Sequence, residues 1–227
     1  EEGDDFGEIK ANMSWQKSTL NKGILPDRGW SQNLALELAT PGSDYPYYKA
    51  TWTGQRYWPI AGNWVLRTRP DLGYGDGYGN DFVLPFFENF FSGGMGSVRG
   101  YESRSLGPRS EGLAYAVSDP RIEDPDPDPV GGNMLVGAGL ELIFPTPFAP
   151  RSRSVRTFLF FDGGNVFQTE VENNLFEFDV DELRYSAGIG LTWLTVIGPL
   201  SFNFAETIND QPGDETEVFQ FSLGQVF

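Results

Sequence analysis

The sequence contains neither cysteine nor histidine among its 227 residues. Without thiols or imidazoles the chain cannot form disulfides, Ser-His-Asp triads or histidine-ligated metal sites. Positive charge is scarce as well, since 16 Lys and Arg residues stand against 32 Asp and Glu residues, giving a net charge of -16. Because so acidic a chain repels a phosphate backbone, no nucleic-acid partner is expected.

Long hydrophobic runs are also missing. Only 39% of the residues are hydrophobic, and no stretch approaches the ~20 consecutive apolar residues that a membrane-spanning helix needs. The opening residues, EEGDDFGEIK, do not read as a signal peptide, because no basic segment precedes an apolar one. Glycine and aromatic residues, by contrast, are abundant, with 28 Gly and 15% aromatics. This composition is typical of membrane β-barrels.

Apolar and polar residues alternate with a period of two along much of the chain. The pattern is clearest in LRYSAGIGLTW, residues 183–193, and it recurs in residues 32–39 and 217–227. One face of each segment is apolar, and the other carries small or polar residues. The apolar face of the first segment consists of Leu183, Tyr185, Ala187, Ile189, Leu191 and Trp193. Such segments are typical of strands that separate lipid from a polar lumen.

The alternation predicts nine strands, at 6–18, 29–40, 46–60, 63–74, 133–144, 154–167, 181–196, 200–208 and 217–227. Most of their connections alternate between short turns, such as 59–63 and 196–200, and long acidic segments at 75–132 and 168–180. Short turns at one rim and long loops at the other are typical of an outer-membrane barrel. Bacterial single-chain barrels close with even strand numbers, so nine strands indicate a truncated barrel.

A soluble β-sandwich or lipocalin-like barrel is the alternative, with its apolar face pointing inward. Two features favour the membrane barrel: Gly, Ser and Thr gather on the face opposite the aromatics, and aromatic residues stand at strand ends, where they would form girdles at the lipid headgroups. These girdle residues are Tyr45, Tyr47, Trp58, Trp64 and Trp193.

The stretch PFFENFFSGGMGSVRGYESRSLGP, residues 85–108, resembles the signature of the outer-membrane assembly and two-partner-secretion barrel superfamily. In that superfamily the sixth surface loop carries a Val-Arg-Gly-Phe/Tyr motif and folds back into the lumen. Val98, Arg99, Gly100 and Tyr101 match this motif. Further stretches resemble the β-barrel assembly factors of the superfamily, over nearly the whole chain: 41–52, 66–79, 139–148, 155–167, 184–205 and 219–227.

The resemblance implies an all-β fold, a transmembrane antiparallel β-barrel. Residues 1–227 would form the C-terminal portion of a sixteen-strand barrel, including the long surface loop 75–132 with its VRGY motif. The early barrel strands and the periplasmic POTRA domains would be missing.

In the superfamily the loop arginine reaches acidic residues on the inner barrel wall. Glu141 lies between two leucines in GLELIFP, and Asp162 follows Phe161 in FFDGG, so the alternation places both carboxylates in the lumen. Arg99 is therefore expected to pair with Glu141, Asp162 or both. The alternative is an ordinary solvated loop arginine, which spacing alone does not exclude.

Three other motifs bear on the strand pattern or could suggest a binding site. Pro70 and Asp71 interrupt a strand, and because proline donates no ladder hydrogen bond, a bulge or early strand end is expected there. EDPDPDP, residues 123–129, could suggest calcium, but it lacks the calcium-loop pattern and favours a solvated loop crown. GYGDGYGND, residues 73–81, favours a flexible strand-to-loop transition over a phosphate loop. No catalytic residue, cofactor or metal is expected.

The final segment, FQFSLGQVF, resembles the C-terminal signal recognised when outer-membrane proteins are assembled. Its motif residues are Phe219, Phe221, Leu223, Gly224 and Phe227. As the last strand of an incomplete sheet it would also present an unpaired edge, which invites strand addition. The segment could equally be one more lipid-facing strand, and both interpretations can hold together.

The resemblance implies a non-enzymatic insertase in the bacterial outer membrane, which opens a seam so that an edge strand, its lateral gate, templates a client strand. Its partners would be outer-membrane lipid, unfolded outer-membrane β-barrel clients and, through the missing POTRA domains, accessory lipoproteins of the assembly complex. The alternatives are a translocation-module or polypeptide-secreting barrel of the same superfamily, and a passive pore.

Overall fold

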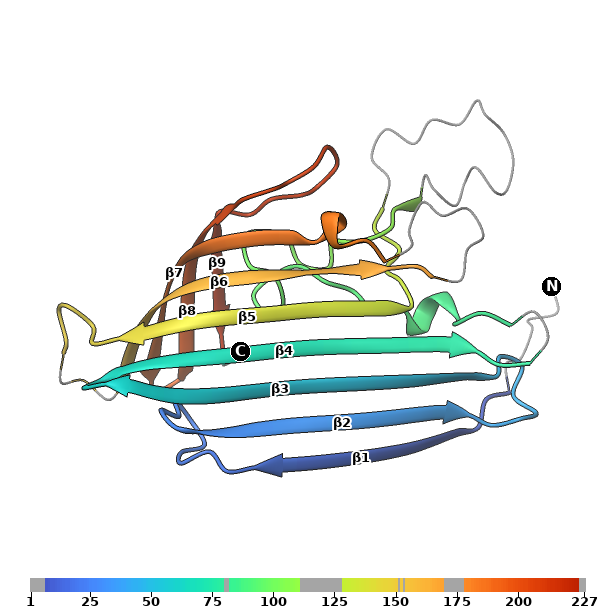
Figure 1. The fold of residues 1–227 in the computed structure, drawn as a ribbon, viewed down its shortest axis with the longest axis horizontal. Coiled ribbons are helices and arrows are strands. Elements are labelled where there is room, and N and C mark those ends of the chain that lie inside the picture. The colour runs from blue at the N-terminus through green and yellow to red at the C-terminus, as the bar shows by residue number, and fades with distance from the viewer. Residues whose placement is uncertain are drawn as a thin grey trace.

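The computed structural model describes residues 7–79, 82–110, 128–150, 152, 154–169 and 178–224. In this part of the chain nine strands form one antiparallel sheet in chain order (Figure 1). None of its helices is long and apolar enough to cross a membrane. The elements are β1 Lys10–Ser18, β2 Gly29–Ala39, β3 Tyr47–Ala61, β4 Trp64–Gly77, the 3-10 turn η1 Phe86–Glu88, β5 Met134–Phe144, β6 Val155–Phe167, the 3-10 turn η2 Val180–Glu182, β7 Arg184–Thr195, β8 Gly198–Thr207 and β9 Phe219–Leu223.

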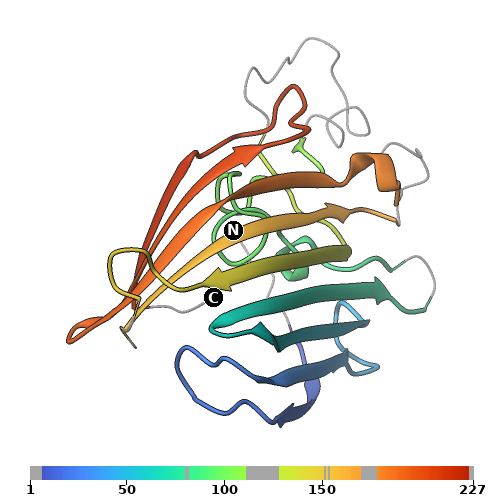
Figure 2. The ribbon, with the colours of Figure 1, turned by 60° about the vertical axis from the view of Figure 1, so that its left-hand side comes forward.

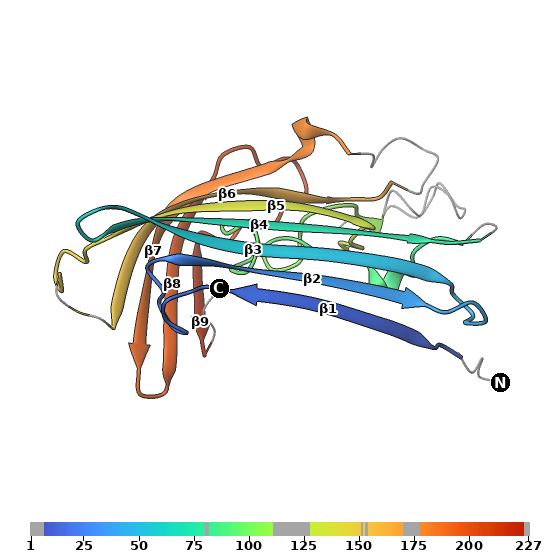
Figure 3. The same cartoon turned by 60° about the horizontal axis from the view of Figure 1, so that its bottom comes forward.

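The sheet is strongly curved. Strands β7 to β9 stand at a steep angle to β1 to β4, so the sheet has a convex and a concave face (Figures 2 and 3). Among the described residues β1 and β9 are the two edges, each paired on one side. Such curvature is what a sheet needs to wrap around a barrel lumen.

The two faces have the polarity that the sequence predicts, except at Tyr47: this expected girdle residue is 0% exposed and donates to Glu37 on the inner face. Large apolar side chains of the convex face are exposed, as for Leu140 at 47%, Ile189 at 44% and Trp193 at 48%. Polar side chains of the opposite face are buried, and Asp162 and Ser186 are 0% exposed. Because a water-soluble sandwich would bury the apolar face instead, this inverted pattern confirms the lipid-facing assignment.

The connections also separate into two rims as predicted. The connections that follow β1, β3, β5 and β7 leave the sheet at one rim, and those that follow β2, β4, β6 and β8 leave it at the other. Most strand ends lie within a few residues of the predictions. The final strand is shorter than predicted, at Phe219–Leu223, and residues 225–227 lie outside the described part of the chain.

The fourth strand continues a little beyond its predicted end at residue 74, because β4 extends to Gly77. The glycines that suggested a loop instead make room for the chain that returns along the inner face. A Cβ on Gly73 would lie 2.6 Å from the Phe90 ring, and one on Gly77 would lie 2.2 Å from the Phe82 carbonyl oxygen. The described part of GYGDGYGND is therefore mostly strand.

The bulge or early strand end expected at Pro70 is wrong. Pro70 lies within β4 opposite Ala138 of β5, and the pairs Thr53↔Asp71 and Arg56↔Thr68 on either side of it keep the same offset to β3. Gly54 makes this possible, since a Cβ there would lie 3.3 Å from the Pro70 ring. The observed shift in register lies elsewhere, between Pro59 and Ala61.

Candidate functional site

The chain that follows β4 folds back over the concave face of the sheet, and its residues 82–110 are called the docked loop below. The VRGY motif is its most deeply buried part, with Val98 1%, Arg99 4% and Tyr101 0% exposed. Gly100 has a φ of +91°, and a Cβ there would approach the Ala205 Cβ to 3.0 Å. Only glycine therefore fits both the backbone conformation and the space at this position.

Arg99 binds both predicted carboxylates. Its Nε and Nη2 atoms donate to the two oxygens of Asp162 at 2.6 and 2.9 Å, and its Nη1 atom donates to Glu141 at 2.9 Å. Asp162 also accepts the Arg99 backbone N–H at 3.2 Å, and the guanidinium carbon lies 3.8 Å from the centre of the Phe160 ring. Such a bidentate, stacked geometry suits arginine and not lysine.

Charge stabilises the guanidinium in this buried position. Burial by itself would lower the pKa of Arg99, but the adjacent Asp162 and Glu141 carboxylates outweigh it and raise that pKa above its ordinary value. The two carboxylates therefore favour the charged form of the arginine.

The sheet register brings the two carboxylates together. Residue 139 pairs with residue 162 across β5 and β6, so Glu141 and Asp162 project from neighbouring positions of the same face. Gly139 leaves the space that Asp162 occupies, because a Cβ there would lie 2.7 Å from its Oδ1 atom. Gly164 does the same for the docked loop, since its Cβ would lie 3.3 Å from Val98.

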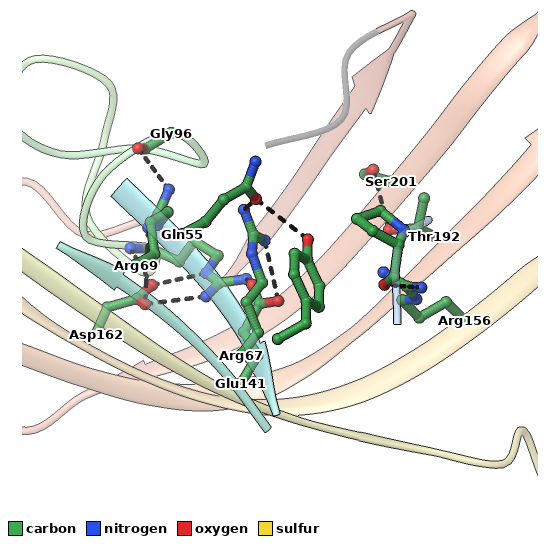
Figure 4. Close-up of polar contacts among 12 residues, drawn as sticks. Gln55, Arg67, Arg69, Gly96, Glu141, Arg156, Asp162, Thr192 and Ser201 are labelled. Carbon is green, nitrogen blue, oxygen red and sulfur yellow. Dashed lines mark hydrogen bonds and ion pairs between the residues drawn. The ribbon is translucent and has the colours of Figure 1, made fainter. Parts of the chain in front are cut away.

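Arg67 is a member of this cluster that the sequence interpretation missed. It lies opposite Glu141 in the register of β4 and β5 and donates to that carboxylate at 3.1 Å and to Gln55 at 3.0 Å. Figure 4 shows these side chains converging from neighbouring strands. The sequence could have predicted this position, because the alternation places residue 67 on the lumen-facing side of β4.

Arg69 is a second missed member. Its guanidinium donates to the Gly96 and Ser97 carbonyls of the docked loop, at 2.6 Å each, and lies 3.8 Å from Asp162 (Figure 4). Arg69 therefore holds the loop by its backbone, whereas Arg99 reaches from the loop to the wall. Every residue has a backbone carbonyl, so neither residue type nor spacing could predict this contact.

A second anchor holds the docked loop near its start. Glu88 of η1 accepts from Lys10 of β1 at 2.5 Å and from Lys49 of β3 at 3.3 Å, and its carbonyl accepts from Lys49 at 2.5 Å. Burial would raise the pKa of Glu88, but the hydrogen bond from Lys10 and the charges of both lysines lower it below its ordinary value of 4.5. No motif pointed to this anchor.

The predicted residues of the final strand lie on the convex side of β9. Phe219, Phe221 and Leu223 are 46%, 53% and 53% exposed, and the two phenylalanines contact phenylalanines of β8. Gly224 follows the strand with a φ of +87°, and Phe227 lies outside the described residues. These positions present an apolar row along an edge strand.

The other motifs add no chemistry to this site. Of the stretch 123–129, only Asp128 and Pro129 belong to the described residues. Within the described ranges no group of three or more acidic side chains is placed to hold a metal ion.

Comparison with known proteins gives consistent matches. The family profile of the Omp85 superfamily domain matches residues 1–227. The outer membrane protein assembly factor BamA of Neisseria meningitidis serogroup B is 35% identical, over 96% of this chain and 28% of that protein. The sorting and assembly machinery component 50 homolog of Mus musculus is 29% identical, over 90% of this chain and 42% of that protein.

A solved structure shares the fold. The crystal structure of BamA from Haemophilus ducreyi lacking POTRA domains 1–3 superposes with a TM-score of 0.81 and 36% identity, covering 93% of this chain and 41% of that chain. The chain thus spans less than half the length of these relatives.

Proposed function

Because the chain belongs to the Omp85 superfamily, we propose that it forms part of the transmembrane barrel of an assembly factor that inserts β-barrel proteins into the bacterial outer membrane. The bacterial relatives carry the name outer membrane protein assembly factor, which supports both the location and the role. The proposed action is non-enzymatic and uses no cofactor.

The observation that carries the proposal is a sheet with an apolar edge strand whose inner face is occupied by a docked loop. Arg99 closes this arrangement with three side-chain hydrogen bonds to buried carboxylates. A wide, water-filled pore needs no such insertion, so the docked loop supports an assembly role over a passive pore.

The edge strand could lower the free-energy cost of bringing a client strand into the membrane. A client segment carries backbone N–H and C=O groups that cannot enter hydrocarbon unpaired. Pairing with the edge of β9 would satisfy these groups, and the exposed row of Phe219, Phe221 and Leu223 would keep the new strand beside lipid. The proposed partners are therefore outer-membrane lipid and unfolded β-barrel clients, with accessory lipoproteins bound by parts of the longer protein.

The test is reconstitution of the full-length protein in lipid vesicles with an unfolded client barrel. We expect the client to acquire heat-resistant gel mobility faster than in vesicles without the protein. Conductance is measured on the same vesicles. Client folding at the protein-free rate, together with a steady open-pore conductance, would favour the passive pore and contradict the proposal.

A further inference from the structure

Gln220 of β9 connects the C-terminal strand to the docked loop by hydrogen bonds. This side chain is 2% exposed and points to the concave face, opposite its neighbours Phe219 and Phe221. Its Nε2 atom donates to the Tyr101 carbonyl at 2.8 Å, and its Oε1 atom accepts the Gly100 N–H at 3.4 Å. Both ends of the amide therefore bind the backbone of the VRGY motif.

The chain just before β9 pairs with the same motif. Glu217 N–H donates to the Gly100 carbonyl at 2.8 Å, and Glu102 N–H donates to the Glu215 carbonyl at 2.9 Å. Thr216 and Tyr101 form an antiparallel bridge between these bonds. The docked loop thus acts as a short additional strand for the segment that leads into β9.

Among the described residues, β9 pairs with β8 over five residue pairs, whereas β7 and β8 pair over ten. Segments with few backbone hydrogen bonds open with a small free energy. The contacts from the loop therefore add to what fixes the position of this strand.

We propose that Gln220 is a positioning residue that latches β9 to the docked loop, so that docking of the loop sets how freely the edge strand moves. The inference rests on the proposed function, in which β9 is the strand that meets a client. The Arg99 anchor lies on β5 and β6 and does not involve Gln220. Removing the Gln220 hydrogen bonds should therefore loosen β9 while the loop stays docked.

Amide hydrogen exchange of the full-length protein in lipid nanodiscs tests the latch. In Gln220→Leu we expect the β9 amides to exchange roughly tenfold faster, the scale of about one lost buried hydrogen bond. Amides of β5, β6 and Arg99 should keep their wild-type rates. Asn203→Leu is the matched control, because Asn203 is a 3% exposed amide opposite Gln220 on β8 and should leave β9 exchange unchanged.

Two outcomes would overturn the latch: β9 exchange equal to wild type in Gln220→Leu, or an equal rise at Arg99 and throughout β5 and β6, which indicates general destabilisation. Should Gln220→Leu fail to fold, Gln220→Glu keeps the acceptor but lacks the amide donor to Tyr101, and the same β9-specific rise is expected.

Client assembly separates this inference from the proposed function. If β9 exchanges faster and the rate of client folding changes with it, both are supported. If β9 exchanges faster while client folding in the vesicle assay is unaltered, the latch stands and the role of β9 as the client-binding edge fails.

Discussion

At the scale of single residues, the site consists of charges taken out of water and paired with one another. Arg99 alone uses three guanidinium nitrogens and its backbone N–H on two carboxylates. Buried charges are tolerated only when they are paired and hydrogen-bonded, because the desolvation penalty of each ion is several kcal/mol. Loss of one partner is therefore more damaging than the pair itself is stabilising.

Replacement of Arg99 should be strongly destabilising for this reason. We expect Arg99→Ala to lower the free energy of unfolding by ~3–5 kcal/mol, since Asp162 and Glu141 would remain buried without their common partner. Urea unfolding followed by tryptophan fluorescence measures the change. Arg28→Ala, an exposed arginine in a turn, is the control and should alter stability little. An Arg99→Ala protein as stable as this control would show that the guanidinium is dispensable.

At the scale of elements, alternation predicted the strands and the pairing faces, because lipid on one side and polar contacts on the other select residues with a period of two. It therefore placed Glu141 and Asp162 correctly on the inner face. It ended β4 too early where glycine serves packing instead of turning: Gly77 lies in β4, and a side chain there would meet the returning loop. Alternation also could not predict the Glu88 anchor, because Lys10, Lys49 and Glu88 are far apart in the sequence and form no motif.

The Glu88 anchor of η1 should respond to acid. The pKa of this carboxyl is lower in the folded protein than its ordinary value of 4.5, so its stabilising contribution is complete above that value and is lost as the pH falls through the folded pKa. We expect wild type to be more stable than Glu88→Gln by about 1 kcal/mol at pH 7.

Thermal unfolding of both proteins at pH 7 and near pH 3 measures this dependence. The difference between them should shrink towards zero at the lower pH. Glu102→Gln, which changes an exposed glutamate of the same loop, is the control variant. A difference of constant size at both values would contradict the ionic nature of the anchor.

At the scale of the whole molecule, the distribution of polarity decides the environment. The convex face exposes apolar side chains along the length of the sheet, and the concave face buries arginines, carboxylates and amides. For a chain of net charge -16, a continuous apolar outer surface is the property that fits a bilayer.

A charge placed on that outer surface should be costly. Ile189 lies in the middle of β7 and is 44% exposed on the convex face, so we expect Ile189→Arg to lower the free energy of unfolding in lipid by ~2–4 kcal/mol. Thr53→Arg, on the concave face near Asp71, is the control and should be tolerated. Reversible unfolding in lipid vesicles provides the comparison, and an equal loss in both variants would contradict the assigned sidedness.

The spacing of the loop contacts along the chain also dictates an order of events. Arg99 binds Glu141 and Asp162, which lie 42 and 63 residues downstream, and Gly100 binds Gln220, which lies 120 residues downstream. Contacts so distant in sequence form late, after the intervening strands have paired. Residues 215–220 supply the hydrogen bonds at this end of the motif, so docking of the loop is completed only once the last strand is in place.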